Sequence, residues 1–173
     1  MTQVKASFRS GWLDHQTWRS DEGGSVMPCR IPEPLKAEHD ELHAELARAT
    51  KAGGATGQAA QAVARIMHPH FVKEEEYALP PLGLLGELAE GKLDPGMSAA
   101  LKMTDKLQAE LPQMLAEHKS IVGALKVLIE AAKKEGKPDV VQFAERLIAH
   151  ARGEEEVSYP AALLVGRYLA AKL

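Results

Sequence analysis

The chain has 173 residues, of which 45% are apolar and 5% aromatic, and its formal net charge is −3. This size and composition suit one domain with a sizeable core, and the scattered Lys and Arg residues form no basic stripe that would bind nucleic acid. No apolar stretch is long enough to cross a bilayer, and Cys29 is the only cysteine, which excludes an internal disulfide. Since the N-terminus also lacks the apolar segment of a signal peptide, we expect a cytoplasmic protein with no membrane and no nucleic-acid partner.

The sequence predicts an N-terminal arm followed by one helical domain. Residues 1 to 31 contain two Trp residues and a Gly pair and show no helical periodicity, so we expect them to form the arm. Residues 32 to 173 are rich in alanine and leucine and have few β-branched runs, which indicates an all-α domain. Its first helix is expected to begin near Pro34, because proline is tolerated in the first turn, and to end at Gly53-Gly54.

Three more long helices are expected to follow, with short extra helices between and after them. The predicted segments are a second helix over 58–78 with a kink at Pro69, a short helix over 79–89, a loop over 91–96, a third helix over 97–134 with a bend at Pro112, a fourth over 139–158, and a terminal helical extension over 160–173. Four long helices with short or medium connections predict an up-down-up-down four-helix bundle.

A pattern of histidine and glutamate occurs twice in the chain. Residues four apart on a helix lie on one face, so each His-x-x-x-Glu pair can point at one ion. Two such half-sites predict a binuclear metal centre, although a tandem helical duplication with structural His–Glu hydrogen bonds is the alternative. The copies are His70-x-x-x-Glu74-Glu75-Glu76-x-x-x-Pro80 and His150-x-x-x-Glu154-Glu155-Glu156-x-x-x-Pro160, preceded by Glu38-His39 and Glu117-His118.

This pattern resembles the hemerythrin-like family, also called HHE cation-binding domains, over about residues 32 to 165. The resemblance implies a four-helix bundle that holds two non-haem irons. Oxygen-carrying hemerythrins have a further His one turn along the third helix, where this chain has Val122, and His43 is the candidate to replace it. The metal ligands expected on this basis are His39, His43, His70, Glu74, His118, His150 and Glu154.

The donor set favours a transition metal over calcium. Imidazole and carboxylate suit iron, manganese or zinc, whereas calcium prefers oxygen alone. The resemblance favours two iron ions, and Glu74 and Glu154 could bridge them as carboxylates from two facing helices. Manganese or zinc is the alternative.

We expect the two ions to differ. If His43 binds, one ion would be held by three histidines, and the other would keep an open position lined by Ile121 and Val122. The remaining carboxylates of each Glu triplet are expected in solvent or beside a ligand histidine, and Tyr77 and Tyr159 are expected to pack rather than to bind metal. The expected histidine groups are His39, His43 and His70 for the first ion and His118 and His150 for the second.

The leading hypothesis for function is a non-haem di-iron protein that binds dioxygen or nitric oxide at an open iron position between the helices. A redox enzyme that decomposes peroxide or nitric oxide is the alternative, as is an iron-responsive interaction module. The sequence leaves open whether the protein is an enzyme, and it identifies no protein partner.

Overall fold

The structure, a computed structural model, describes residues 29–173. These residues form helices and include no strand, which confirms the predicted all-α fold. Of the predicted arm only the last residues, from Cys29, are described, so the division at residue 31 stays a prediction. The four long helices are α1 (Glu33–Ala49), α2 (Gly54–Lys73), α4 (Ala99–Lys134) and α5 (Pro138–Gly153).

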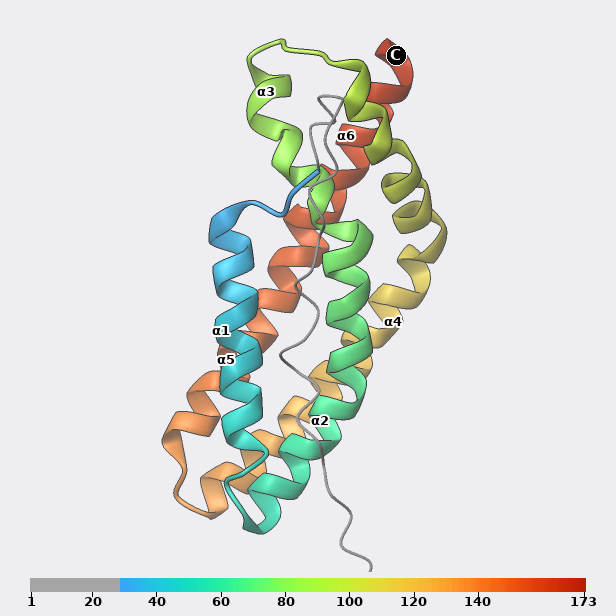
Figure 1. Cartoon of the computed structure of the whole chain (residues 1–173). Coiled ribbons are helices and arrows are strands. Elements are labelled where there is room, and N and C mark those ends of the chain that lie inside the picture. The colour runs from blue at the N-terminus through green and yellow to red at the C-terminus, as the bar shows by residue number, and fades with distance from the viewer. Residues whose placement is uncertain (1–28) are drawn as a thin grey trace, which may run out of the picture.

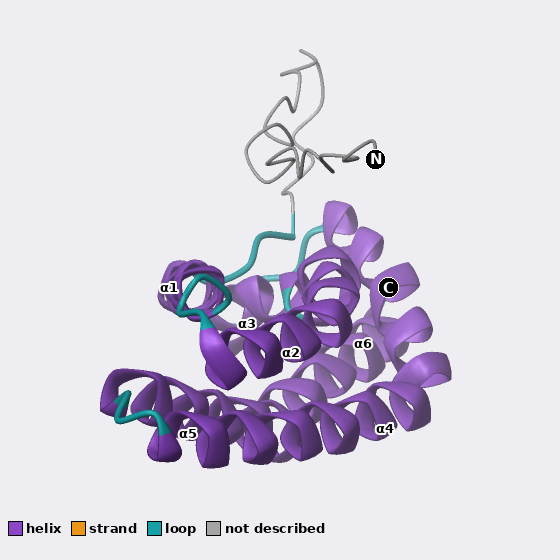
Figure 2. Cartoon of the chain, turned by 90° about the horizontal axis from the view of Figure 1, so that it is seen from below, coloured by secondary structure: helices purple, strands orange, loops and turns teal. Residues whose placement is uncertain are grey.

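The long helices alternate in direction, as the up-down-up-down prediction requires (Figure 1). The α1–α2 and α4–α5 turns lie at the same end of the bundle, at the bottom of Figure 1. In the view of Figure 2, α1 and α2 lie above α5 and α4, and each helix contacts its two neighbours around the ring. The crossover from α2 to α4 holds the short helices η2 (Pro80–Leu84), α3 (Leu85–Ala89) and η3 (Pro95–Ser98), and α6 (Tyr159–Lys172) follows α5.

Glycine and proline set the bounds of the long helices. Gly53 and Gly54 take positive φ values of 69° and 59° in the α1–α2 turn, and Gly136 takes 66° after α4. Glycine adopts this left-handed conformation without the steric cost that a Cβ would add. The second helix begins at Gly54 rather than at the predicted residue 58, and it continues through Pro69 without a break.

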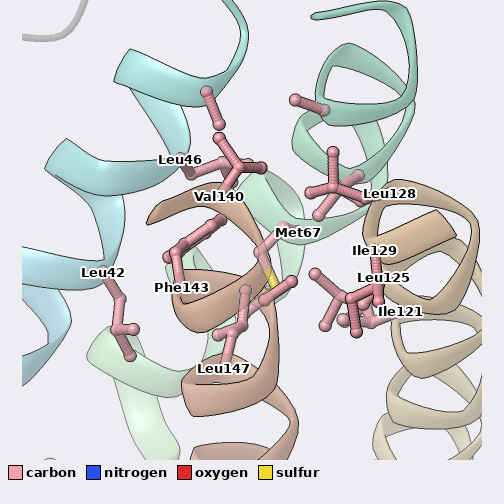
Figure 3. Close-up of a cluster of buried hydrophobic side chains, with 14 of the residues drawn as sticks. Leu42, Leu46, Met67, Ile121, Leu125, Leu128, Ile129, Val140, Phe143 and Leu147 are labelled. Carbon is pink, nitrogen blue, oxygen red and sulfur yellow. The ribbon is translucent and has the colours of Figure 1, made fainter. Parts of the chain in front are cut away.

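The core consists of two apolar clusters with a polar layer between them. The first cluster fills the turn end of the bundle and contains Leu42, Met67, Leu125 and Leu147, each at most 1% exposed (Figure 3). The second lies toward the crossover end, around α6. Along every long helix the candidate metal ligands fall between residues of these two clusters, so the candidate centre is in the middle of the bundle. Residues of the second cluster include Tyr77, Leu79, Leu107, Met114 and Tyr159.

Each copy of the His-Glu repeat ends in a turn of π-helix, which the sequence analysis did not predict. The turns are η1 (Glu74–Ala78) and η4 (Glu154–Ser158). The Leu79 N–H donates to the Glu74 carbonyl oxygen at 2.9 Å, and the Tyr159 N–H donates to the carbonyl of Glu154, five residues earlier in both cases. The prolines of the repeat follow directly, and a proline has no N–H with which to continue the α-helical pattern.

Within residues 29–173, none of the helices combines the length and apolar character that crossing a membrane needs. The cytoplasmic location expected from the sequence stays a prediction.

Candidate metal centre

Six of the seven predicted ligands meet in two groups. In each group one nitrogen from each of two histidines and one carboxylate oxygen lie within 4.8 Å of one another. We call these groups the open half, which contains His39, His150 and Glu154, and the closed half, which contains His70, Glu74 and His118. All six side chains are at most 5% exposed.

The carboxylate of Glu154 faces both halves. Its Oε1 lies 3.3 Å from His39 Nε2 and 3.2 Å from His150 Nε2, while its Oε2 lies 3.6 Å from His118 Nε2. Glu74 Oε1 lies 3.0 Å from His70 Nε2 and 3.6 Å from His118 Nε2. An oxygen toward each group is the geometry by which one carboxylate can bridge two ions.

Each of the four histidines in these groups has a glutamate oxygen near its Nδ1 atom, on the side of the ring away from the centre. On one side of the bundle, Glu117 Oε2 lies 2.8 Å from His70 Nδ1 and Glu155 Oε1 lies 3.0 Å from His118 Nδ1. On the other side, the equivalent glutamates of the repeat lie near the Nδ1 atoms of the equivalent histidines, which gives the centre an approximate twofold symmetry. The distances there are 3.2 Å from Glu38 to His150 Nδ1 and 3.7 Å from Glu75 to His39 Nδ1.

These outer carboxylates orient the imidazoles. A carboxylate at Nδ1 fixes the proton there and leaves Nε2, which points into the centre, free to bind a metal. Glu75 and Glu155 therefore take the second of the two places expected for them, beside a histidine, whereas Glu76 and Glu156 are exposed. The repeated Glu-His pairs were the sequence signal for Glu38 and Glu117, but only the structure shows that each contacts the histidine of another helix.

The buried carboxylates hold protons on the imidazoles. Burial lowers the pKa of His39, but its hydrogen bond to Glu154 and its interaction with the nearby Glu75 carboxylate outweigh that effect and raise the pKa to about 10. The pKa values of His70 and His150 are also raised, against the effect of burial, by their interactions with Glu74 and Glu154 respectively. A cation is thus strongly favoured here, and a metal ion would displace these protons.

We expect the metal-free protein to lose stability as the pH rises from 6.5 to about 10. His39 keeps its proton up to about pH 10 in the folded chain but loses it near pH 6.5 when unfolded, so its contribution is complete below pH 6.5 and absent above about 10. One proton corresponds to a fall of at most about 1.4 kcal/mol per pH unit. Urea unfolding in the presence of a chelator, repeated across this pH range, measures how the free energy of unfolding changes with pH. His39→Gln should make this dependence shallower, and stability that rises with pH would contradict the expectation.

Buried oxygens in the centre suit a bound cation. Among the described residues, neither Glu74 Oε2 nor Glu154 Oε2 has a hydrogen-bond donor, although both atoms are buried. Leaving a buried acceptor unsatisfied costs about 1–3 kcal/mol, and more for a charged group. A metal ion between the two groups would satisfy both oxygens, so the residues present fit the metal that the pattern implies.

Tyr159 places a hydroxyl group in the closed half. Its Oη donates to Glu74 Oε1 at 2.5 Å and lies 3.2 Å from His118 Nε2 and 3.5 Å from His70 Nε2. The ring is 1% exposed and stacks against His118. Burial, followed by the negative charges of Glu74 and Glu154, raises the pKa of this hydroxyl, so it is a donor here. The residue packs as expected, but its contact with the ligand groups was missed.

Tyr159 has no counterpart in the open half, and the sequence contains a signal for this difference because the two copies of the repeat differ at the tyrosine positions. Eighty residues before Tyr159 the chain has Leu79, and eighty residues after Tyr77 it has Val157. Leu79 and Val157 line a cavity of about 410 Å³ that reaches the open half and is also lined by its three ligand residues. Val157 is 64% exposed, so the cavity extends to the surface. At the equivalent places in the closed half, two buried tyrosine rings fill the space.

The expected grouping of the histidines was wrong. His39 of α1 lies with His150 of α5, and His70 of α2 lies with His118 of α4, although α1 also contacts α2. The cavity opens on the His39 and His150 half, so the open position predicted beside Ile121 and Val122 is not supported. His43 belongs to neither group. Its ring stacks on Phe71 with centroids 4.0 Å apart, and burial lowers its pKa.

Comparison with known proteins agrees with the pattern. The family model of the hemerythrin HHE cation binding domain matches residues 30–162. Neither a curated protein nor a solved structure matches the chain.

Proposed function

The chain belongs to the hemerythrin HHE cation-binding family, and from this premise we propose that it holds two iron ions and binds dioxygen or nitric oxide at one of them. The proposed ligands are His39, His150 and Glu154 for one ion and His70, Glu74 and His118 for the other, with Glu154 bridging. Manganese or zinc would suit the same donors. His43, outside both groups, is not needed for this ligand set.

The cavity on the open half carries the proposal for the binding position. It is the place where a small molecule can reach the candidate ligands from solvent, and its walls include the apolar side chains of Leu79 and Val157. In the closed half, the buried rings of Tyr159 and Tyr77 stand at the positions equivalent to Leu79 and Val157. The lining of the cavity also includes Glu38 and Arg146, and the size of the cavity favours a small molecule over a large one.

Iron would supply an electron-rich site for a diatomic ligand when it is bound in the reduced state. The protein's own part is to hold the imidazoles, through Glu38 and Glu75 in the open half, and to leave one position without a protein ligand. That half offers three protein donors, of which one is shared with the other ion. Three donors leave room for an added molecule at an ion that accepts five or six.

Filling the cavity should abolish binding at the open half. Leu79→Tyr copies the residue found at the equivalent position 159, and its ring would occupy the cavity. In iron-loaded protein, we expect optical titration with nitric oxide or azide to show saturable binding by the unmodified chain and at least a tenfold weaker response of Leu79→Tyr, about 1.4 kcal/mol or more. Both proteins should contain two irons. Val127→Tyr, which adds the same ring at a position that is 63% exposed, is the matched control.

The same titration distinguishes the other functions. A band that forms with dioxygen and disappears on degassing supports reversible binding, whereas loss of peroxide or nitric oxide beyond one equivalent per centre identifies a redox enzyme. Iron-loaded protein that binds none of these ligands would contradict the proposal and favour an iron-responsive interaction module.

A further inference from the structure

Tyr159 Oη lies at the point where the donor atoms of the closed half converge. Its separations from Glu74 Oε1, His118 Nε2 and His70 Nε2 are 2.5, 3.2 and 3.5 Å. Glu74 Oε1 is itself 3.0 Å from His70 Nε2 and 3.6 Å from His118 Nε2. Donor atoms about 2.1 Å from one ion lie roughly 3.0 to 3.4 Å apart at octahedral or tetrahedral angles. The distance to His118 Nε2 falls in this range, the distance to His70 Nε2 is just above it, and the shorter distance to Glu74 Oε1 is that of a hydrogen bond which ends when the hydroxyl loses its proton. The hydroxyl oxygen is therefore close enough to these atoms to serve as a further donor.

The π turn brings Tyr159 to this place. Five residues of α-helix turn through about 500°, which would put the side chain of residue 159 roughly 140° around the helix from Glu154. In η4 the Tyr159 N–H instead bonds to the carbonyl of Glu154, and this wider turn brings the two residues toward the same side. Both side chains then face the centre.

The surroundings hold the phenol ring in position. Tyr159 packs in the second apolar cluster with Leu107, Met114 and Ala162, each fully buried. The His118 ring stacks against it with centroids 5.6 Å apart and an interplanar angle of 21°. The hydrogen-bond partners of its hydroxyl among the described residues are the candidate metal ligands His70, Glu74 and His118, so the polar end of this side chain has its contacts inside the closed half.

We propose that Tyr159 Oη is a protein ligand of the ion in the closed half, which would then have two histidines, Glu74 and a phenolate. This inference rests on the proposed two-metal centre. As the ion enters, the Oη–metal bond forms, the O–H bond breaks, and the proton is released to solvent, as for other protein ligands that must be deprotonated. Burial disfavours loss of the hydroxyl proton, whereas a metal cation bound beside the oxygen favours it.

The consequence is a centre with two unlike ions. The closed half would have an additional anionic oxygen donor, whereas the open half has Leu79 at the equivalent position and the cavity beside it. An anionic oxygen stabilises the more highly charged ferric ion. The ion of the closed half should therefore stay ferric under conditions in which the ion of the open half is reduced.

Resonance Raman spectroscopy of the full chain, loaded with two ferric ions, tests the ligand directly. An iron–phenolate bond gives a visible charge-transfer band, and excitation within it enhances the ring vibrations of the bound tyrosine. We expect this signature in the unmodified chain and its complete loss in Tyr159→Phe, which keeps the ring and removes only Oη. Tyr77→Phe is the matched control, since Tyr77 is also buried but its hydroxyl donates to Glu110 and lies beside Met114.

The outcomes separate this inference from the proposed function. Two bound irons without a phenolate signature, or a signature that persists in Tyr159→Phe, would overturn the role of Tyr159 and leave the two-metal centre standing. A chain that binds no iron at all would overturn both. Loss of the signature in Tyr77→Phe but not in Tyr159→Phe would show that Tyr77 is the ligand and would also refute the inference.

Discussion

If the chain holds two ions as proposed, Glu154→Ala will reduce its metal content to less than one. The reason is that its two oxygens face different groups, with Oε1 next to His39 and His150 and Oε2 3.6 Å from His118 Nε2. Removing it takes one donor from each ion and leaves two positively charged ions without the carboxylate between them. Losing a buried charged partner costs about 3–5 kcal/mol, or at least a hundredfold in affinity.

Metal analysis after gel filtration measures this effect. Glu156→Ala is the matched control, because it belongs to the same Glu triplet but is exposed. Glu74→Ala should also lower the metal content, through loss of the ion of the closed half, because Glu74 Oε1 lies 3.0 Å from His70 Nε2. Two metals retained by both Glu154→Ala and Glu74→Ala would show that the ions are bound elsewhere.

Removal of the metal will lower the melting temperature of the chain by about 8–16 °C or more. Each ion at a free concentration a thousandfold above its dissociation constant adds about 4 kcal/mol to the stability of the folded state. For a protein of this length, 1 kcal/mol corresponds to about 2–4 °C. The metal-free chain stays folded in this expectation, because protonated imidazoles such as His39 take over part of the charge compensation of Glu154.

Calorimetry with and without a chelator measures this difference, and adding iron back should restore the original midpoint. Glu154→Ala serves as the control, since a variant that has already lost its metal should not respond to the chelator. If the unmodified chain melted at the same temperature in both conditions, the six candidate ligands would not be holding a metal that stabilises the fold.

The sequence predicted which helices carry the candidate ligands but not how these ligands pair. The four-residue spacing of His70 and Glu74 fixes their common face whatever the tertiary structure, and it was read correctly. Each helix has two neighbours around the bundle, and spacing along the chain does not determine which neighbour's histidine lies in the same group. His39 therefore was expected with His70 but lies with His150. The family of the chain, by contrast, followed from the repeated pattern alone and is confirmed.

The position of Tyr159 could not be predicted because it depends on a local departure from α-helical geometry. On a regular helix this residue would point away from Glu154. The expectation that it only packs rested on the usual role of a buried tyrosine. Pro160 was visible as part of the repeat, and its missing N–H was a reason to expect an irregular turn. What the sequence did not show was that the turn would be a π turn in both copies.

The π turn η4 also sets the angle between the inward face of α5 and that of α6. His150 of α5 and Glu154 of η4 face the centre, while Ala162, Val165 and Leu169 of α6 are buried at the crossover end. A single uninterrupted α-helix would tie these two sets together at 100° per residue. The wider turn of η4 changes this relation, so that both sets of residues can face inward along one continuous run of helix.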